Sequence, residues 1–504
     1  MVVTSKTLDV GDRGVGWTTP LHGVSGFVRR ALVRAAIDAP VRVFPIVGSN
    51  PPGLVDALRL RRDVRIVDAP ASATVLLVAG DLPDALHEAA MRMHDALAHP
   101  RCTIWWTRET RRDAAPFACP TIVAADRSAS NAEVVDALAV ELRRAHAMLL
   151  RGERQSERGL LPDVDPAPWR GVGPYGQGGA GMTGGVPYGR PMAGRAPDRD
   201  GLELDQLPVR IGPFFPPFPT GLVLDVKLQG DIVQDAVVPG NAFATAAVRA
   251  TDESDIFHAA LTRPVRIAEL ERARAVHHLV WFASALRLHG LGALGRRTLT
   301  LAGSVQHGTE LEVARQVTAL ARLLERTRTL GGATAGVGVT ARETVSGRGL
   351  GPVARAAGVP EDARSDDPAY RALDFTPIVQ SDAAGLGDAR ARWRQRIAET
   401  AQSLELAGRA GDRCTGGAGG SAIERPRGPI SASASAETPT GVLLSVLPVW
   451  LAGLEWGDAV TTIVSLDLDL RESAVGATPL APTLVVEPSG GMGDMSGMEM
   501  KGSA

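Results

Sequence analysis

Short apolar runs alternate with stretches of helical periodicity in the first part of the chain. Five runs have the length and composition of buried strands: 41–47, 64–67, 74–79, 103–106 and 121–125. Three stretches between or after them carry apolar residues at helical spacing: 53–60, 82–97 and 131–150. Strands that alternate with helices in this way are typical of a parallel sheet. The pattern predicts an α/β domain over residues 41–152, preceded by an N-terminal extension, 1–40.

The pattern then changes to glycine, proline and arginine. Residues 153–207 contain the string GVGPYGQGGAGMTGGVPYGRPMAGRAPDRDG and predict a linker or an extended docking arm. Tyr175, Tyr188 and Met192 are the anchors that such an arm would place on a neighbouring subunit. Simple disorder is the alternative.

A second, mainly helical domain is predicted over residues 208–487. It begins with a proline-rich segment and a hairpin, because polar and apolar residues alternate over 223–229. Helical patterns follow at 267–288, 310–329 and 388–407, and an apolar stretch covers 442–470. We expect an α+β domain in which a helical bundle is flanked by small sheets.

Residues 488–504 form a low-complexity tail, which we predict to be disordered. Its methionines have a spacing that resembles thioether sites for Cu(I), although no histidine accompanies them. They are Met492, Met495, Met498 and Met500.

The amino-acid composition excludes some classes of function and indicates a cellular compartment. The 504 residues include 54 basic and 56 acidic ones, a net charge of −2, which gives no field for holding nucleic acid. Three scattered cysteines suit a reducing compartment, hence the cytoplasm. The first residues lack the apolar run of a signal peptide, and 438–454 is too short and too rich in proline and glycine to span a bilayer. Any membrane association is therefore expected to be peripheral.

Two groups of ordered strings resemble a known pair of subunits. VGSNPPGLVDAL, RRDVRIVDAPASATVLLVAG and HPRCTIWW resemble the small, cluster-carrying subunit that respiratory complex I shares with membrane-bound NiFe hydrogenases. IGPFFPPFPTGLVLDVKLQGDIV, ELERARAVHHLVWFASAL, GVGVTARETVSGRGLGPVARAAGVPEDARSDDPAYRALDF, IERPRG and SLDLDL resemble the large subunit. The resemblance implies a fusion of both subunits in one chain.

The resemblance also implies an electron path from an iron–sulfur cluster to a quinone pocket or a nickel–iron centre. A 4Fe–4S cluster needs four thiolates. The family's first cysteine pair falls near Ser49 and Pro52, and the later ligand loop reads AADRSASNAEVVDAL, so the cluster ligands are missing. We interpret Cys102 and Cys119 as small buried hydrophobes, with a metal role as the alternative, and Cys414 as a loop residue.

The other two sites of the family lack their ligands as well. The nickel-binding cysteines would fall in the segment 467–471, which reads DLDLR, so we expect no nickel–iron centre. The quinone-site histidine and tyrosine are absent from GPFFPPFP and NAFATAAVRATDESD. Phe214, Phe215 and Phe218 either line an apolar slot or simply pack. We therefore expect no cofactor or metal bound by this chain.

One histidine resembles the histidine that commonly follows the Glu-Arg start of a helix in the family. His278, with Glu271 and Arg272 about two turns earlier, is a candidate proton relay or ion-pair network within the bundle. A satisfied core histidine is the alternative.

The leading hypothesis is a redox-inactive subunit of a complex I-like assembly on the cytoplasmic face of the cell membrane. It would have a structural or coupling role beside ion- or proton-translocating membrane subunits. The alternative is a working NADH- or ferredoxin-linked quinone oxidoreductase subunit that uses a cluster on another chain. A third hypothesis is a soluble binding module without a membrane partner.

Overall fold

The computed structural model describes residues 26–48, 53–107, 121–124, 131–162, 194–198, 201–244, 255–381, 386–415, 422–431, 437–474 and 477–481. The chain separates into two units. The larger consists of Met1–Leu161 and Pro208–Leu480, and the smaller of Pro162–Leu207 and Ala481–Ala504.

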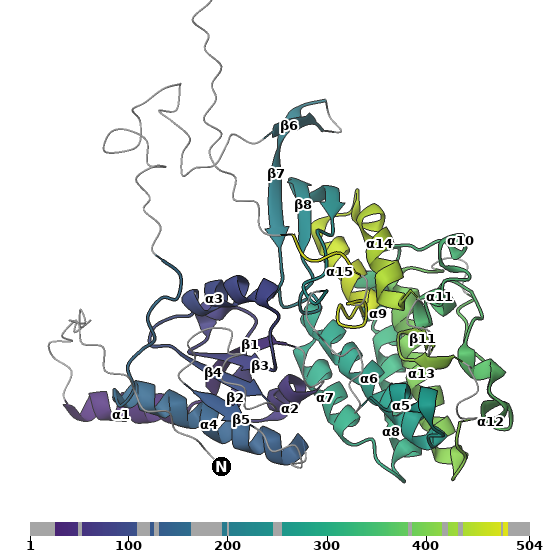
Figure 1. The fold of residues 1–504 in the computed structure, drawn as a ribbon, viewed down its shortest axis with the longest axis horizontal. Coiled ribbons are helices and arrows are strands. Elements are labelled where there is room, and N and C mark those ends of the chain that lie inside the picture. Colours follow the sequence, from purple (N-terminus) through teal and green to yellow (C-terminus); the bar gives the residue numbers. More distant parts are fainter. Residues whose placement is uncertain are drawn as a thin grey trace, which may run out of the picture. The chain divides into compact units, whose positions relative to one another are not determined.

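The first part of the larger unit contains the parallel sheet that the alternating pattern predicts (Figure 1). Its strands are β1 (Val41–Val47), β2 (Val64–Ile66), β3 (Val75–Ala79), β4 (Cys102–Thr107) and β5 (Ile122–Ala124). They lie in the order β2-β1-β3-β4-β5, with all neighbours parallel. The predicted parallel sheet is confirmed, and each strand falls on its predicted run.

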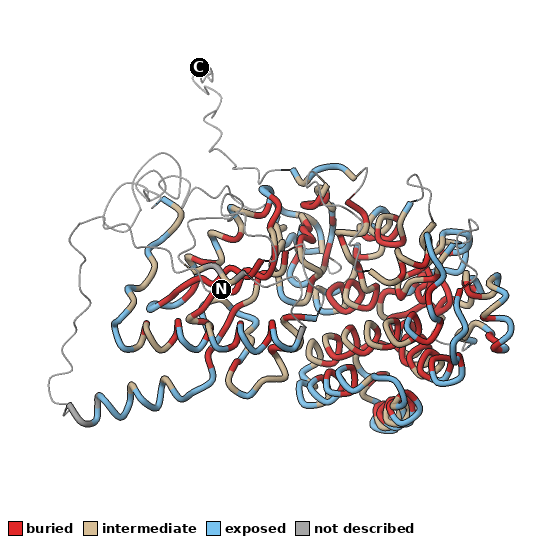
Figure 2. The backbone as a smooth tube through the Cα atoms, turned by 60° about the horizontal axis from the view of Figure 1, so that its bottom comes forward, coloured by how far each residue is buried: buried red, intermediate tan, exposed pale blue. Residues whose placement is uncertain are grey.

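Both faces of this sheet are buried (Figure 2), which explains why its strands are apolar throughout. On one face, Val43, Leu77 and Ile104 pack against α2 (Leu54–Leu60) and α4 (Asn131–Arg151). The alternate positions point the other way and pack with the segment around α3 (His87–Asp95) and with parts of the helical half. A 3-10 turn, Asp84–Leu86, precedes α3, so the helix begins later than its pattern predicts.

One helix and two strands lie in segments for which no regular element was predicted. A helix, α1 (Gly26–Asp38), lies along α4 within the predicted N-terminal extension. The strands β6 (Gly194–Pro197) and β7 (Glu203–Ile211) pair antiparallel, and β7 runs from the predicted linker into the second predicted domain. The proposed anchors of that linker and the four methionines of the tail lie outside the described residues.

The first residues of the predicted linker are bound to the α/β part. The carboxylate of Asp95 accepts hydrogen bonds from the backbone N–H groups of Leu160 and Leu161. The carboxylate of Glu157 accepts from the backbone and hydroxyl of Thr103. The chain therefore stays attached to the sheet as far as residue 161.

The rest of the larger unit is mainly helical, as predicted. It begins with the hairpin of β8 (Leu224–Gln229) and β9 (Ile232–Val237). The helices that follow are α5 (Ile256–Thr262), α6 (Ile267–Leu288), α7 (Gly292–Gly303), α8 (Glu310–Arg326), α9 (Thr329–Thr334), α10 (Arg342–Val345), α11 (Pro352–Ala356), α12 (Pro368–Arg371), α13 (Ala389–Ala410), α14 (Pro439–Leu451) and α15 (Trp456–Leu466). A second hairpin, β10 (Ile423–Arg425) with β11 (Gly428–Ile430), precedes α14.

The core of the helical half lies between α6, α8 and α13, whose apolar faces meet. The bounds of α6 are those predicted, since its pattern runs unbroken from residue 267 to 288. The predicted helix at 310–329 instead divides into α8 and α9 at Arg328, which has a left-handed backbone. In the part of the chain that the structure describes, no helix is long and apolar enough to cross a membrane.

One turn depends on a glycine, and substituting it is our first prediction. Gly351 has φ of 49°, and a Cβ there would lie 2.7 Å from Gly428 Cα and 2.8 Å from the carbonyl oxygen of Arg427. Gly347 also has positive φ, but a Cβ there would meet nothing within 4 Å. We expect Gly347→Ala to lower the free energy of unfolding by about 1 kcal/mol from backbone strain alone. Gly351→Ala should cost at least about 2 kcal/mol more, because the backbone must also move.

Urea denaturation of both variants and the wild type measures the two costs. Equal losses would mean that the segment carrying Gly428 moves aside freely and does not hold the turn.

Candidate functional site: a buried network of charges

Charged side chains gather inside the helical half, where each is at most 8% exposed. We call this set the buried charge network. Its members are Glu271, Arg274, His278, Arg355, Asp362, Arg364, Arg392, Arg396, Glu399 and Glu424. Burying a charge costs several kcal/mol unless another group compensates it. The ion pairs and hydrogen bonds inside the network therefore decide whether the cost of burying these charges is offset.

Two helices supply six of these residues because of their spacing. The three on α6 are Glu271, Arg274 and His278, and the three on α13 are Arg392, Arg396 and Glu399. Residues at positions i, i+3 or i+4, and i+7 share one face of a helix. The polar face of each helix is thus turned inward, beside the apolar residues that form the core.

Arg355, at the end of α11, is the hub of the network. Its Nε donates to Glu399 Oε1 at 2.7 Å, and its Nη1 lies 2.9 Å from Glu424 Oε1 and 3.0 Å from Asp362 Oδ2. Burial alone would raise the pKa of Glu399. The charge of Arg355 and the contact with His278 outweigh that effect and hold the pKa well below its ordinary value.

Glu271 is held by a second set of contacts. Arg364 is bidentate to Asp362, at 3.0 and 2.8 Å, and its Nη1 lies 3.2 Å from Glu271 Oε2. The hydroxyl of Tyr370 donates to Glu271 Oε1 at 2.6 Å, and Arg274 lies 3.3 Å from the same carboxylate. Burial and the negative charge of Glu271 raise the pKa of Tyr370 well above its ordinary value, so the phenol keeps its proton.

His278 sits at the edge of the network without a hydrogen bond in the described structure. Its Nε2 lies 3.6 Å from Glu399 Oε2, which is too far for a hydrogen bond, and both ring nitrogens are buried. Burial lowers the pKa of His278 to about 4, even though the carboxylate of Glu399 acts in the opposite direction. The ring is therefore neutral at physiological pH.

Glu424 on β10 is the carboxyl of the network that is most ready to bind a proton. Burial and the negative charge of Asp362 raise its pKa, against the opposing charge of Arg355. Glu424 Oε2 also accepts from the backbone N–H of Ala363 at 3.2 Å. A carboxyl with a raised pKa beside a fixed guanidinium can store a proton and release it when a neighbouring charge moves.

A second cluster occupies the segment where the family resemblance would place nickel ligands. Asp467, at the end of α15, accepts from His277 Nε2 at 2.8 Å, and its backbone oxygen accepts from Arg427 Nε at 2.7 Å. Arg427 Nη1 lies 2.8 Å from Glu472. Burial would raise the pKa of Asp467, but the positive charge of Arg427 lowers it well below its ordinary value. Asp467 thus contacts side chains from two other segments, α6 and the turn between β10 and β11.

The structure brings together two of the three residues proposed for a proton relay. Glu271 and His278 are both in the network, whereas Arg272 points elsewhere and contacts Glu310, at 2.7 Å, and His307. The link from Glu271 to His278 runs through Arg364, Asp362, Arg355 and Glu399 in that order, with contacts of 3.2, 2.8, 3.0, 2.7 and 3.6 Å. Sequence reasoning did not single out these connecting residues. Arg355, Asp362 and Arg364 lie in one of the strings that carried the resemblance, and Glu399 lies outside those strings.

The cysteines are placed as follows. Cys102 is buried in β4. Cys414 is exposed beside the start of α6, where its backbone pairs with that of Arg266 in an isolated antiparallel β-bridge. Cys119, Ser49 and Pro52 lie outside the described residues. Within the described ranges, no group of three or more histidine, cysteine or acidic side chains is arranged to hold a metal ion.

The phenylalanines near residue 215 contact a tryptophan. Phe215 and Phe218 meet edge to face at a centroid distance of 4.9 Å, and both rings lie near Trp456 of α15. Phe214 packs at the margin of the same apolar core. These contacts join the start of the helical half to its last helix.

Part of this region is similar to a known protein family. Residues 306–430 match the family model described as the respiratory-chain NADH dehydrogenase 49 Kd subunit. No curated protein sequence matches the chain. A solved chain of the membrane-bound sulfane sulfur reductase, an archaeal respiratory membrane complex, aligns with 54% of this chain and 98% of that one, at 17% identity and a TM-score of 0.39. The match to the family model confirms the predicted resemblance to a complex I large subunit for 306–430, the range that holds Arg355, Glu399 and Glu424.

Proposed function

We propose that this chain is a peripheral subunit of a complex I-like membrane assembly and that it contributes structure or coupling without a redox centre of its own. In this proposal the α/β part corresponds to the small subunit and the helical half to the large one. The chain lies on the cytoplasmic face of the membrane, beside integral subunits that move protons or other ions. The match of 306–430 to the 49 Kd subunit supports the large-subunit part.

The observation that carries the coupling role is the buried charge network. Seven of its ten members lie within the matched range. Ion pairs among them connect α11, α13 and β10 to α6. Arginines and carboxylates that share several partners can form more than one favourable set of ion pairs. When Glu424 gains a proton it loses its negative charge, and a different set of ion pairs becomes the most stable one. Such a network can pass a change of charge from one element to another without electron transfer.

The proposal is tested by isolating the chain with its natural partners. We expect affinity purification from membranes in mild detergent to recover integral membrane proteins with the full chain. Iron and acid-labile sulfide in the separately expressed chain should be far below one cluster per molecule. One 4Fe–4S cluster per chain, with its electron paramagnetic signal, would contradict a redox-inactive role.

The alternative, an oxidoreductase subunit that uses a cluster on another chain, is an outcome of the same experiment. Quinone reduction by the purified assembly, lost in His278→Gln while the assembly stays intact, would favour the alternative. Unchanged quinone reduction in that variant would count against a role for the histidine in electron or proton delivery.

A further inference from the structure

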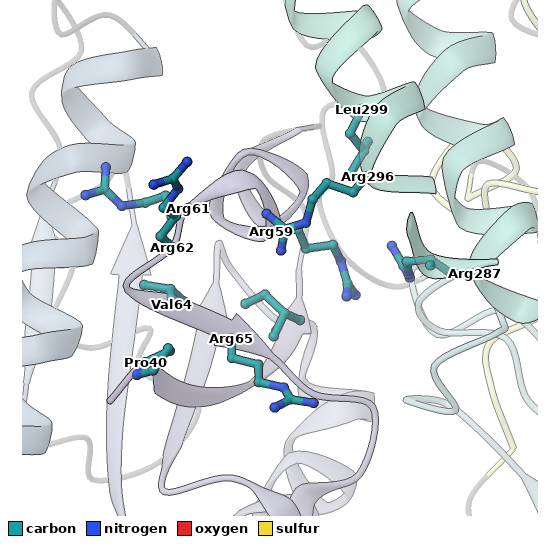
Figure 3. Close-up of a pocket in the computed structure, with 11 residues that line it drawn as sticks. Pro40, Arg59, Arg61, Arg62, Val64, Arg65, Arg287, Arg296 and Leu299 are labelled. Atoms are coloured by element: carbon teal, nitrogen blue, oxygen red, sulfur yellow. The ribbon is translucent and has the colours of Figure 1, made fainter. Parts of the chain in front are cut away.

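A cleft lined by arginines lies in the larger unit, between the α2–β2 corner and the α6–α7 corner (Figure 3). Its volume is about 560 Å³, within the range of small-molecule sites. The described residues that line it are Pro40, Arg59, Arg61, Arg62, Val64, Arg65, Ile66, Arg287, Gly292, Arg296 and Leu299. Six of these are arginines and none is acidic. Four are apolar or proline residues, so the cleft also has an apolar wall.

Some of these arginines have carboxylate partners outside the cleft. Arg61 binds Asp63 at 2.8 Å and also contacts Asp136. Arg59 lies 3.8 Å from both Asp56 and Asp68, which is beyond hydrogen-bond distance. Arg59 Nε is moreover buried without a hydrogen-bond partner among the described atoms.

The other four arginines form no close ion pair in the described structure, although the charge of Arg287 acts on the carboxyl of Asp56 and opposes the rise in its pKa. No acidic side chain there lies within 4 Å of the guanidinium groups of Arg62, Arg65, Arg287 or Arg296. Arg287 Nη1 is buried without a hydrogen-bond partner, and Arg296 Nη1 donates only to the backbone oxygen of Leu60, at 3.3 Å. The cleft therefore presents an excess of positive charge with unused donors.

Like charges face each other across the cleft. Burial and the positive charge of Arg287 lower the pKa of Arg59 to about 10. The guanidinium therefore remains charged at neutral pH, but its charged form is less favourable than it would be in water. An anion between these two arginines would offset their repulsion and satisfy their free N–H groups.

We propose that this cleft binds a ligand with two or more phosphoryl groups. The planar guanidinium fork matches the oxygens of a phosphoryl group, and several unpaired arginines call for several negative charges on one ligand. The apolar wall of Pro40, Val64 and Leu299 accommodates the part of the ligand that bears the phosphates. Soluble diphosphates and the headgroup of a diphosphatidyl lipid share this chemistry.

The cleft is distinct from the buried charge network. Arg287 lies nine residues after His278 on α6, which corresponds to about 14 Å along the helix axis. A ligand there would hold α2 of the α/β part against α7 of the helical half, because both corners contribute arginines. Binding is thus expected to stabilise the contact between these two parts of the larger unit.

The test titrates the full chain with defined probes. ADP and pyrophosphate represent soluble diphosphates, inorganic phosphate is the single-phosphoryl control, and phosphatidylcholine vesicles with or without cardiolipin represent the lipid source. We expect saturable binding by calorimetry or co-sedimentation, and a rise of about 2–5 °C in the midpoint of thermal unfolding with the soluble probe that binds. Inorganic phosphate should bind more weakly than pyrophosphate.

Variants locate the site. The double variant Arg62→Gln, Arg296→Gln removes two exposed guanidinium groups and is expected to weaken binding at least about tenfold, because charge-assisted hydrogen bonds are lost. Arg315→Gln on α8, an exposed arginine paired with Glu312, is the matched control and should leave binding unchanged.

Each outcome decides the proposal. Binding of ADP or pyrophosphate without vesicle binding identifies a soluble ligand, and cardiolipin-dependent sedimentation identifies a lipid headgroup. Both support the proposal if the double variant weakens binding. Failure of every probe to bind saturably, or equal affinity in the double variant and the wild type, overturns it.

Discussion

Replacing Arg355 by leucine is expected to destabilise the helical half strongly. The side chain is fully buried and is the shared partner of Asp362, Glu399 and Glu424. Removing it leaves buried carboxylates without a counter-charge, which costs about 3–5 kcal/mol or more. Domains are stable by only about 5–15 kcal/mol in total, so this loss removes much of the margin.

Urea denaturation followed by circular dichroism measures the effect, and the yield of soluble protein is a second readout. Arg355→Lys should remain strongly destabilised, because a single ammonium cannot replace a fork that serves three carboxylates. Arg315→Gln removes an exposed arginine and should change the free energy of unfolding by less than about 0.5 kcal/mol. If Arg355→Leu unfolded within 1 kcal/mol of the wild type, roughly the cost of an ordinary substitution, Arg355 would not be the hub of the network.

The sheet could be predicted from sequence because the burial of each strand is visible in the residues of that strand alone. A strand covered on both faces, such as β3 (Val75–Ala79), must be apolar at every position, and this leaves an unbroken run in the sequence. The helix α1, by contrast, leaves no apolar pattern in the sequence. Most of its described side chains are exposed, as at Leu32, so no apolar face stands out. The strands β6 and β7 were missed because glycine and proline conceal a pairing that depends on a partner strand.

The candidate site could be predicted only in part. His278 and Glu271 are seven residues apart, which places them on one face of α6, and both are buried as the pattern implies. Arg272 follows Glu271 directly, so it is turned by about 100° around the helix and faces Glu310 instead. The partners of Arg355 lie far along the chain, at Glu399 and Glu424, and helical periodicity carries no information about such distant pairs.

Acidification is expected to destabilise the chain through His278. In the unfolded state its pKa is about 6.5. In the folded state burial lowers the pKa of His278 to about 4. Between these two values the unfolded state binds more protons than the folded state, so stability falls as the pH falls from 6.5 towards 4. The difference of about 2.5 units between the two pKa values corresponds to about 3.4 kcal/mol of folding stability. This contribution is present in full above pH 6.5 and is lost as the pH approaches 4.

The measurement is the free energy of unfolding in urea at several pH values for the wild type and His278→Gln. Burial also lowers the pKa of His146 and His289, which add to the slope in both proteins. The difference in slope between the two curves therefore isolates His278, and it should amount to about 1.2 kcal/mol per pH unit near pH 5.5. Leu279→Val, a buried change beside it without a titrating group, should lower stability by about 1 kcal/mol at every pH.

The same curves separate the two interpretations of this histidine. A relay that works near neutral pH needs a group that takes up a proton there, whereas a ring held neutral by burial resists protonation until the pH approaches 4. If the curves of His278→Gln and the wild type are parallel, the ring is hydrated or protonated in the folded protein and is free to act in a relay. If the variant flattens the slope as expected, the proton-holding group of the network must be sought among its carboxyls. Glu424 is then the first candidate, because burial and Asp362 raise its pKa.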